Sequence, residues 1–231
     1  MALDRSTVQR ATHWNFNRES NHMGRDTAVY RFIQAEGELR RRAIALHRQR
    51  YMEVGFMPSD FQDPYEKGSR YFVAWHEETQ QAVGVCRLVL QELRTLPTYH
   101  HFELFEHERR GLEQWKPGTY AELGALTKLP HHADVTPGLI ATALAHASAQ
   151  GMSHVLCCID QRLFQSVRAH LGIPLQVIGR ERLFYGSLKI PCVVHISDTL
   201  EQLWVHKPQV LQRLAPQPGA PGDVALPGRA A

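Results

Sequence analysis

The pattern of hydrophobic and polar positions predicts strands and helices that alternate along most of the chain. Apolar runs at 71–75 and 82–90 flank the polar segment HEETQQ, which is typical of a hairpin. Residues 38–53 have the spacing of a helix, and 28–37 and 119–129 are further strand candidates. The first half of the chain is therefore expected to contain a strand, a helix and a hairpin, with one more strand after a less regular stretch.

The second half carries clearer helix boundaries. Thr136 as the cap and Pro137 as the first helical residue predict a helix that continues to 150 and ends at Gly151. A buried strand over 153–160 is predicted to follow it.

Beyond this strand, the pattern predicts a helix over 161–172, stopped by Gly172 and Pro174, and two more strands within 174–197. An amphipathic helix over 199–214 follows, and a short helix is expected around 107–115. This order mixes antiparallel neighbours with a strand–helix–strand crossover. It predicts an α+β fold, with a mixed central sheet covered by helices on both faces.

Composition divides the chain into an arm, one domain and a tail. Residues 1–27 are polar, and residues 215–231 are mostly Ala, Pro and Gly. The folded domain is expected to span 28–214. No apolar run has the length of a membrane span, and the first twenty residues lack the apolar core of a secretory signal, so a cytoplasmic location is expected.

The overall composition excludes several classes of protein. The chain has 231 residues, 43% of them hydrophobic and 21% charged, which is too apolar for a disordered protein. A net charge of +3 is too small to indicate nucleic-acid binding. Four cysteines without a CxxC or a zinc spacing indicate neither a disulfide scaffold nor a metal site.

Positive charge is concentrated in the first predicted helix. This helix includes Arg40, Arg41, Arg42, Arg48 and Arg50. Such a run is most often a solvated helix face, but it can also attract an acidic partner.

Four short segments carry the chemistry. An aromatic residue, Tyr51, closes the first helix, and the loop after it contains Asp60 and Asp63. Arg87 lies in the strand sequence GVCRL, and Glu122 opens the sequence ELGA. In their order and spacing these segments resemble the acyl-homoserine-lactone synthases and the related long-chain N-acyl amino acid synthases.

The resemblance covers about 28–200 and implies a GNAT-like three-layer α/β/α sandwich around a mostly antiparallel sheet. It also implies transfer of a long acyl group to an amine. Two positions depart from the lactone-synthase pattern: His47 stands where those enzymes carry an arginine, and Ala125 stands where the arginine of their E-x-S-R motif is found. The departures make an N-acyl amino acid the favoured product. A homoserine lactone made from S-adenosylmethionine remains an alternative, and so does a non-catalytic binding protein.

Amide formation from a thioester needs a base for the amine. Glu122 lies in an otherwise apolar strand, where burial raises a carboxyl pKa, although an exposed edge strand would also suit it. The backbone at Leu123 and Gly124 is expected to bind substrate, because glycine permits close approach of the thioester; a ligand-free β-bulge is the alternative. His47 and Tyr51 are expected to bind substrate.

Arg87 and the two aspartates form a second predicted group. A guanidinium in an apolar strand needs partners, and either the pair Asp60 and Asp63 or an acceptor carboxylate would serve. The two aspartates could instead bind the ammonium group of the acceptor, so Asp60, Asp63 and Arg87 are expected to bind substrate. Turn capping is the ordinary role of aspartates beside prolines, as these are.

The donor is expected to be an acyl-phosphopantetheine thioester on an acyl carrier protein. The loop LPHHADVTPG has one glycine and carries Asp134, which would repel the pyrophosphate of acetyl-CoA. An acidic carrier protein would also give the basic helix, through Arg40, Arg41, Arg48 and Arg50, a docking role. No tightly bound cofactor, metal or nucleic acid is expected.

Overall fold

The fold is organised by one mixed sheet. The computed structural model describes residues 30–58 and 60–209. In these residues eight strands form the sheet in the order β1-β2-β3-β4-β5-β8-β6, and β7 also pairs with β8. The strands are β1 (Tyr30–Ala35), β2 (Ser69–His76), β3 (Gln81–Val89), β4 (Tyr120–Lys128), β5 (His154–Asp160), β6 (Gln176–Val177), β7 (Arg182–Phe184) and β8 (Ser187–His195). The pair β4 and β5 runs parallel and the other pairs run antiparallel, as predicted.

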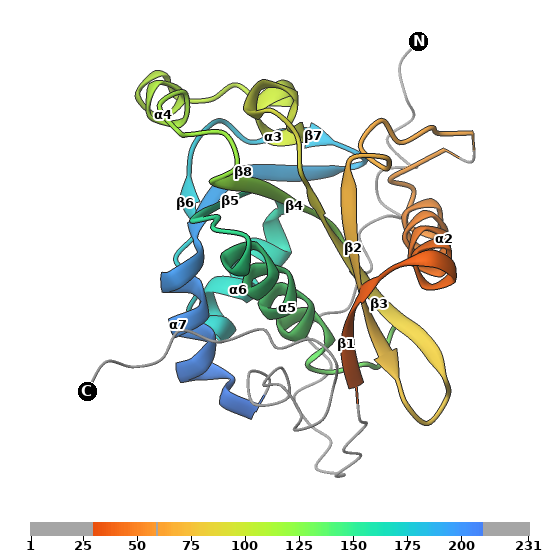
Figure 1. Cartoon of the computed structure of the whole chain (residues 1–231). Helices are drawn as coiled ribbons and strands as arrows, with labels where there is room; N and C mark the ends of the chain where they lie inside the picture. Colours follow the sequence, from red (N-terminus) through yellow and green to blue (C-terminus); the bar gives the residue numbers. More distant parts are fainter. Residues whose placement is uncertain (1–29, 59, 210–231) are drawn as a thin grey trace.

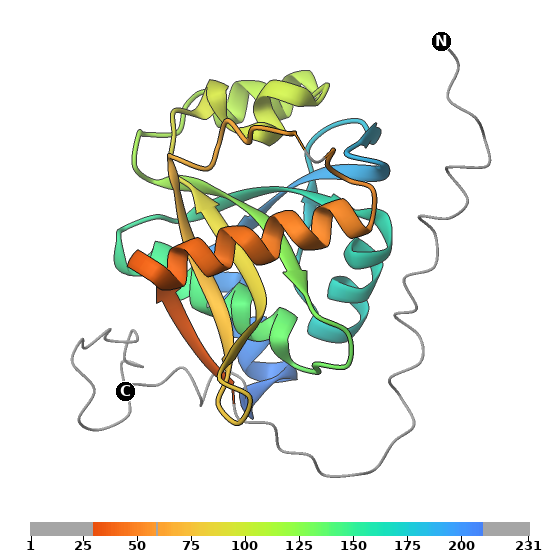
Figure 2. The ribbon, with the colours of Figure 1, turned by 90° about the vertical axis from the view of Figure 1, so that its right-hand side faces the viewer.

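Helices cover both faces of the sheet (Figure 1). Helix α2 (Gly37–Glu53) crosses one face, as Figure 2 shows, and buries Ala43 and Leu46 against it. On the opposite face α5 (Val135–Ala149), α6 (Gln161–Leu171) and α7 (Ile196–His206) enclose the larger core. Short elements η2 (Leu93–Thr95), α3 (Pro97–His101) and α4 (Glu106–Leu112) lie together at one end of the sheet. The predicted three-layer α+β sandwich is confirmed.

Most element boundaries lie close to their predicted positions, but the predicted start of α5 is wrong. Asp134, with a left-handed φ of 58°, occupies the N-cap, and Thr136 and Pro137 lie inside the first turn. Proline is tolerated throughout that turn because its N–H groups have no intrahelical partner, so Pro137 does not fix the first residue.

The segment 174–197 contains three strands rather than the predicted two. Strands β7 and β8 are joined by Tyr185 and Gly186, whose φ values of 47° and 71° match a type I′ turn. Helix α3 is also absent from the prediction. The arm 1–27, the tail 215–231 and the end of the predicted last helix lie outside the described residues.

Strands β4 and β5 diverge, and this divergence opens the centre of the sheet. Their parallel pairing covers three positions, the last of which joins Glu122 to Leu156. On its other side β4 stays paired with β3, but the register shifts opposite Val85–Arg87, and Ala125 adopts a φ of 52°. This β-bulge bends β4 away from β5.

No helix in the described part of the chain is long and apolar enough to cross a membrane.

Candidate active site

The diverging strands border a cavity of about 480 Å³. Its walls come from β4 beyond Glu122, from the end of β5, from the start of β8 and from α5 and α6. The end of α2 closes it through Tyr51 and Phe56. This volume lies within the range of small-molecule binding sites.

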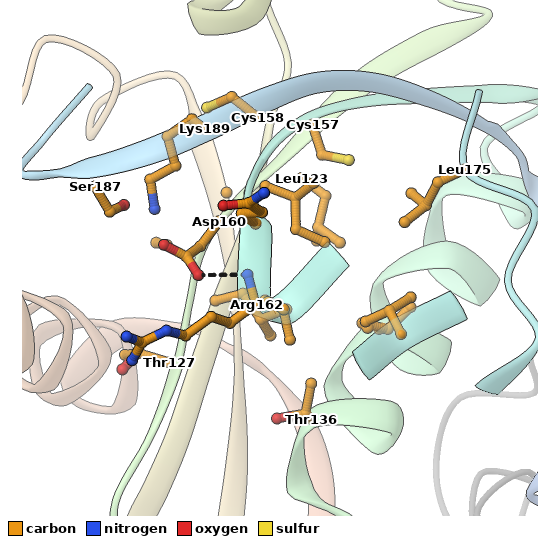
Figure 3. A pocket seen from close by; sticks show the side chains of 18 of the residues that line it. Leu123, Thr127, Thr136, Cys157, Cys158, Asp160, Arg162, Leu175, Ser187 and Lys189 are labelled. Carbon is orange, nitrogen blue, oxygen red and sulfur yellow. Dashed lines mark hydrogen bonds between the residues drawn. The ribbon is translucent and has the colours of Figure 1, made fainter. Parts of the chain in front are cut away.

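The cavity has an apolar end and a charged end. Side chains from α5, α6 and the following loop, including Ile140, Val167 and Leu175, make the apolar end. At the opposite end Figure 3 shows Asp160, Ser187 and Lys189 close together, with Leu175 on the far side. An elongated apolar group fits the first end and a charged group fits the second.

The β-bulge places backbone along one wall of the cavity. Gly124 and Ala125 both line it, directly after the last position of β4 that pairs with β5. A bulge leaves a residue of the strand out of the ladder, so its backbone N–H is available for a ligand. Such an N–H group is the kind of donor that stabilises the oxyanion of a tetrahedral intermediate.

Glu122 is buried behind this wall, with 1% of its surface exposed. Its carboxylate accepts hydrogen bonds from the backbone N–H of Thr98, at 3.0 and 2.8 Å, and from the Thr98 hydroxyl at 2.8 Å. Burial raises the pKa of Glu122 to about 7, while Thr98 and Arg87 act in the opposite direction. Glu122 is therefore poised to exchange a proton near neutral pH, although its side chain is not among the residues that line the cavity.

Cys158 lies between Thr98 and the cavity. Its side chain lines the cavity and contacts the Thr98 side chain. Burial and the nearby Glu122 raise the pKa of the Cys158 thiol to about 12, so it stays protonated and is a poor nucleophile. Cys158 therefore packs as a small apolar residue in the cavity wall.

Arg87 and Asp63 form a buried ion pair on the α2 face of the sheet. Their side chains are 8% and 4% exposed. The guanidinium bonds both carboxylate oxygens, one of them at 3.3 Å, and donates to the Tyr71 hydroxyl at 3.1 Å. Its Nε points toward Gly124, where a Cβ would lie 3.9 Å away. The structure thus brings Arg87 and Asp63 together next to β4.

Asp60 does not join this pair. It is exposed and lines a second, polar hollow of about 800 Å³ together with Arg40, Arg48 and Asp63. Asp63 therefore contacts the buried arginine, while Asp60 lies at the surface.

His47 lies inside the protein beside Tyr51. It is 2% exposed, and its ring meets the Tyr51 ring edge to face at 4.3 Å. Burial and the nearby Arg87 lower the pKa of His47 to about 3, so the ring is neutral at pH 7. His47 thus does not restore the positive charge of the arginine it replaces in the family pattern.

Of the four arginines of α2 that were predicted to dock a carrier protein, three lie at the surface. Arg41 and Arg48 are exposed, and Arg40 is half-buried over the Tyr71 ring. Arg50 is 8% exposed and pairs with Glu53, so its expected place on this surface is wrong. It lies two helical turns after Ala43, on the face that packs against the sheet.

The loop before α5 carries negative charge at the helix N-terminus. Asp134 occupies the N-cap position without a side-chain hydrogen bond to the helix, and its carboxylate lies 3.4 Å from the Lys207 ammonium. A pyrophosphate at this terminus would have to compete with that carboxylate for the helix dipole and for Lys207.

Sequence reasoning missed Thr98, Ser187 and Lys189. Thr98 meets Glu122 only in three dimensions, because 24 residues separate them. Ser187 and Lys189 lie at the start of a mostly apolar strand. The alternation of polar and apolar residues there was the sequence feature that could have identified them.

Comparison of the sequence with protein-family models and with curated proteins finds no match. The fold, in contrast, is similar to solved structures of acyl-transferring enzymes. The AHL synthase LasI has a TM-score of 0.59 and 10% identity, with 78% of this chain and 96% of LasI covered. FeeM, an N-acyl amino acid synthase from uncultured soil microbes, has a TM-score of 0.58 and 13% identity, over 75% of this chain and 96% of FeeM.

A solved structure from outside the acyl-homoserine lactone and N-acyl amino acid synthases is also similar in fold. A putative N-acetyltransferase from Lactobacillus plantarum has a TM-score of 0.51 and 12% identity, over 73% of this chain and 99% of its own. The chain therefore has the GNAT-like fold of these proteins, and the resemblance inferred from the sequence is confirmed at the level of the fold.

Proposed function

We propose that the protein is a cytoplasmic N-acyltransferase that moves a long acyl chain from a carrier-protein thioester to the amine of an amino acid. The cavity between β4 and β5 carries this proposal. It combines an apolar end large enough for an acyl chain, backbone of a β-bulge beside it and a charged end. Its apolar end also argues against a donor that carries only an acetyl group.

The chemistry follows from this arrangement. The amine loses a proton to Glu122 through a water molecule, because Glu122 lies behind the cavity wall, and attacks the thioester carbonyl. Backbone N–H groups at the bulge stabilise the oxyanion, and the carbon–sulfur bond breaks to release the thiolate, which takes up a proton. Arg87, held by Asp63 and Tyr71, fixes the backbone geometry behind Gly124.

A carrier protein is favoured over coenzyme A as the donor. Asp134, at the N-cap position of α5, adds a negative charge next to the helix N-terminus where a pyrophosphate would bind. The guanidinium groups of Arg41 and Arg48 are exposed and could exchange their present partners, Glu38 and Glu66, for the carboxylates of an acidic carrier protein.

Synthesis of an acyl-homoserine lactone from S-adenosylmethionine is the second candidate. The similarity to LasI and the buried ion pair of Arg87 and Asp63 favour it. Ala125 and the neutral His47 argue against it, because neither supplies the positive charge of the family pattern.

Mass spectrometry of lipid extracts decides between these products. Cells that overproduce the protein are compared with cells that produce the Glu122→Gln variant at the same level. We expect new masses of N-acyl amino acids with the wild type and a strong reduction with the variant. Acyl-homoserine lactones instead would establish the second candidate, and no new lipid would favour the non-catalytic alternative.

The donor is tested with purified protein. Turnover with acyl-acyl carrier protein is expected to exceed turnover with acetyl-CoA by orders of magnitude. Comparable rates would contradict the carrier-protein assignment.

A further inference from the structure

The charged end of the cavity contains a buried ammonium group that makes no direct ion pair with a described residue, although the Asp160 carboxylate lies near it. Lys189 is 9% exposed. Its Nζ lies 4.6 Å from the centre of the Phe56 ring and makes no hydrogen bond or ion pair to the described residues. A buried charge that is not paired within the protein is costly unless a ligand pairs with it.

A hydrogen-bonding group lies beside this ammonium. Ser187 precedes Lys189 by two residues, so both side chains leave β8 on the same side, and both line the cavity (Figure 3). The Ser187 Oγ is buried and has no partner among the described residues. Together the two groups offer an ammonium and a hydroxyl to one anionic group of a ligand.

The fold holds these two residues in place. The turn at Tyr185 and Gly186 begins β8, and Gly186 packs against the end of α2: a Cβ there would lie 3.1 Å from the Gly55 carbonyl oxygen and 3.3 Å from Phe56. This close packing fixes the aromatic ring that covers the Lys189 ammonium. The site is thus built from two segments that are far apart in the sequence.

The neighbouring charges indicate what kind of anion fits. Four charged residues of the described chain line the cavity, namely Lys128, Asp160, Arg162 and Lys189. Asp160 is the register partner of Lys189 across β5 and β8, and its carboxylate also caps α6 by accepting from the Arg162 N–H at 3.0 Å. A carboxylate so close to the ammonium opposes a phosphate but suits a ligand that carries a positive and a negative group together.

The position of the site relates it to the proposed reaction. Lys189, Asp160 and Cys158 alternate with the apolar side chains of β8 and β5, so they share the face of the sheet on which Thr98 binds Glu122. A ligand held by its anionic group at Lys189 therefore extends on the side of the sheet where the base is buried.

We infer that Lys189 and Ser187 bind the carboxylate of the amino-acid acceptor and so select α-amino acids over simple amines. This inference rests on the proposed function. Asp160 favours the positively charged form of the incoming amino group, and the face of Phe56 keeps water from the ammonium of Lys189.

Binding of two matched lipids tests the inference without turnover. N-dodecanoylglycine carries the carboxylate, and N-dodecanoylglycinamide replaces it with a neutral amide on the same chain. By calorimetry at pH 7.5 we expect the wild type to prefer the acid by about tenfold to a hundredfold, the range of a hydrogen bond to a charged group. Lys189→Gln should lose this preference and keep its affinity for the amide, and Ser187→Ala should lose part of it.

Lys116→Gln is the matched control, because Lys116 is an exposed lysine in the loop before β4. It should keep the wild-type preference, and thermal unfolding of each variant verifies folding. A wild type that binds both lipids equally or neither of them would overturn the inference, as would a Lys189→Gln variant that still prefers the acid. If Lys189→Gln instead weakens binding of phosphopantetheine and leaves the acid preference intact, the site belongs to the donor phosphate and the inference is wrong.

Failure of the proposed reaction gives a different result. A preference for the acid that depends on Lys189, in a protein that forms no N-acyl product, supports the carboxylate site and rejects the enzymatic role. An N-acyl product formed by a protein without this preference supports the enzymatic role and rejects the site.

Discussion

Three of the buried charged side chains in or near the cavity are compensated in different ways. Arg87 has a carboxylate partner, Asp63. Glu122 is held by hydrogen bonds from one residue, Thr98, and its pKa rises toward neutrality. Lys189 has the face of Phe56 and a nearby carboxylate, Asp160, but no direct ion pair to a described residue. The three therefore differ in what a substitution would cost the fold and in what it would reveal about function.

Glu122→Gln tests the base. Glutamine keeps the size and accepts from Thr98 but cannot take up the proton, so turnover should fall about a hundredfold to ten-thousandfold. Because a base must be deprotonated, the wild-type rate should rise with pH through about 7, and the variant should lack this rise. The measurement is kcat against pH. Near-normal turnover with an unchanged profile would make Glu122 a structural residue.

The same residue predicts a pH dependence of stability. The pKa of Glu122 is about 7 in the folded protein and about 4.5 in the unfolded chain, so between these pH values the folded state retains a proton that the unfolded state has released. The contribution of Glu122 to the free energy of unfolding should therefore decrease as pH rises from about 4.5 to 7. Urea unfolding at pH 5 and pH 8 should show this loss in the wild type and a smaller loss in Glu122→Gln. Equal losses would contradict the raised pKa.

The ion pair of Arg87 and Asp63 should be strongly coupled. Arg87→Met leaves the buried Asp63 carboxylate without its partner and should cost about 3–5 kcal/mol of unfolding free energy. Adding Asp63→Leu removes the stranded charge, so the double variant should recover much of this loss but no activity. Urea unfolding of both single variants and the double variant measures the coupling. Additive losses would show that the two side chains contribute independently.

At the scale of elements, Gly138 lets α5 pack closely against β1. A Cβ on Gly138 would lie 2.0 Å from Cζ of Phe32 in β1. Gly138→Ala should destabilise the protein by about 1–3 kcal/mol, because this overlap outweighs the better helix propensity of alanine. Combining it with Phe32→Leu should restore part of the stability, as measured by chemical unfolding. A stabilised single variant would mean that β1 moves away freely.

The exposed arginines of α2 carry the prediction about the carrier protein. Reversing Arg41 and Arg48 to glutamate should raise the KM for acyl-acyl carrier protein at low salt, and the difference should shrink as salt increases. Arg109→Glu on α4 is the matched control, because Arg109 is exposed and pairs with Glu106 at the spacing that joins Arg41 to Glu38. An unchanged KM in the reversed variant would show that α2 is only a solvated face.

Elements with local signals could be predicted from the sequence. Helix α6 begins at the capping carboxylate of Asp160 and ends at Gly172, with a φ of 63°, and both residues are readable in the chain. Helix α3 has five residues, and its local signal is Pro97 at the first position, without a capping side chain. It is positioned by its contact with Glu122. The start of α5 was predicted wrongly because proline is compatible with more than one position of the first turn.

At the scale of the whole molecule, the site was predictable where the residues follow the family pattern. Tyr51, Leu123 and Gly124 line the cavity, and Arg87 meets Asp63. The divergence of β4 from β5 creates the cavity. It is a tertiary feature, so no residue type in the sequence predicts it. Ser187 and Lys189 reach the cavity only because a turn with two left-handed residues redirects the chain into β8.

Because the buried ammonium of Lys189 makes no direct ion pair to a described residue, replacing it should raise the stability of the unliganded protein and remove the proposed binding function. Lys189→Met keeps the apolar stem, which lies against Phe56, and removes a buried charge; it should stabilise the unliganded protein by about 1–2 kcal/mol at pH 7. Burial lowers the pKa of Lys189, so between that value and 10.5 the unfolded chain binds more protons and the wild type gains stability as pH rises. The advantage of the variant should therefore shrink toward pH 10. Urea unfolding at the two pH values measures it, and a destabilised variant would show that the ammonium of Lys189 serves the fold instead of a ligand.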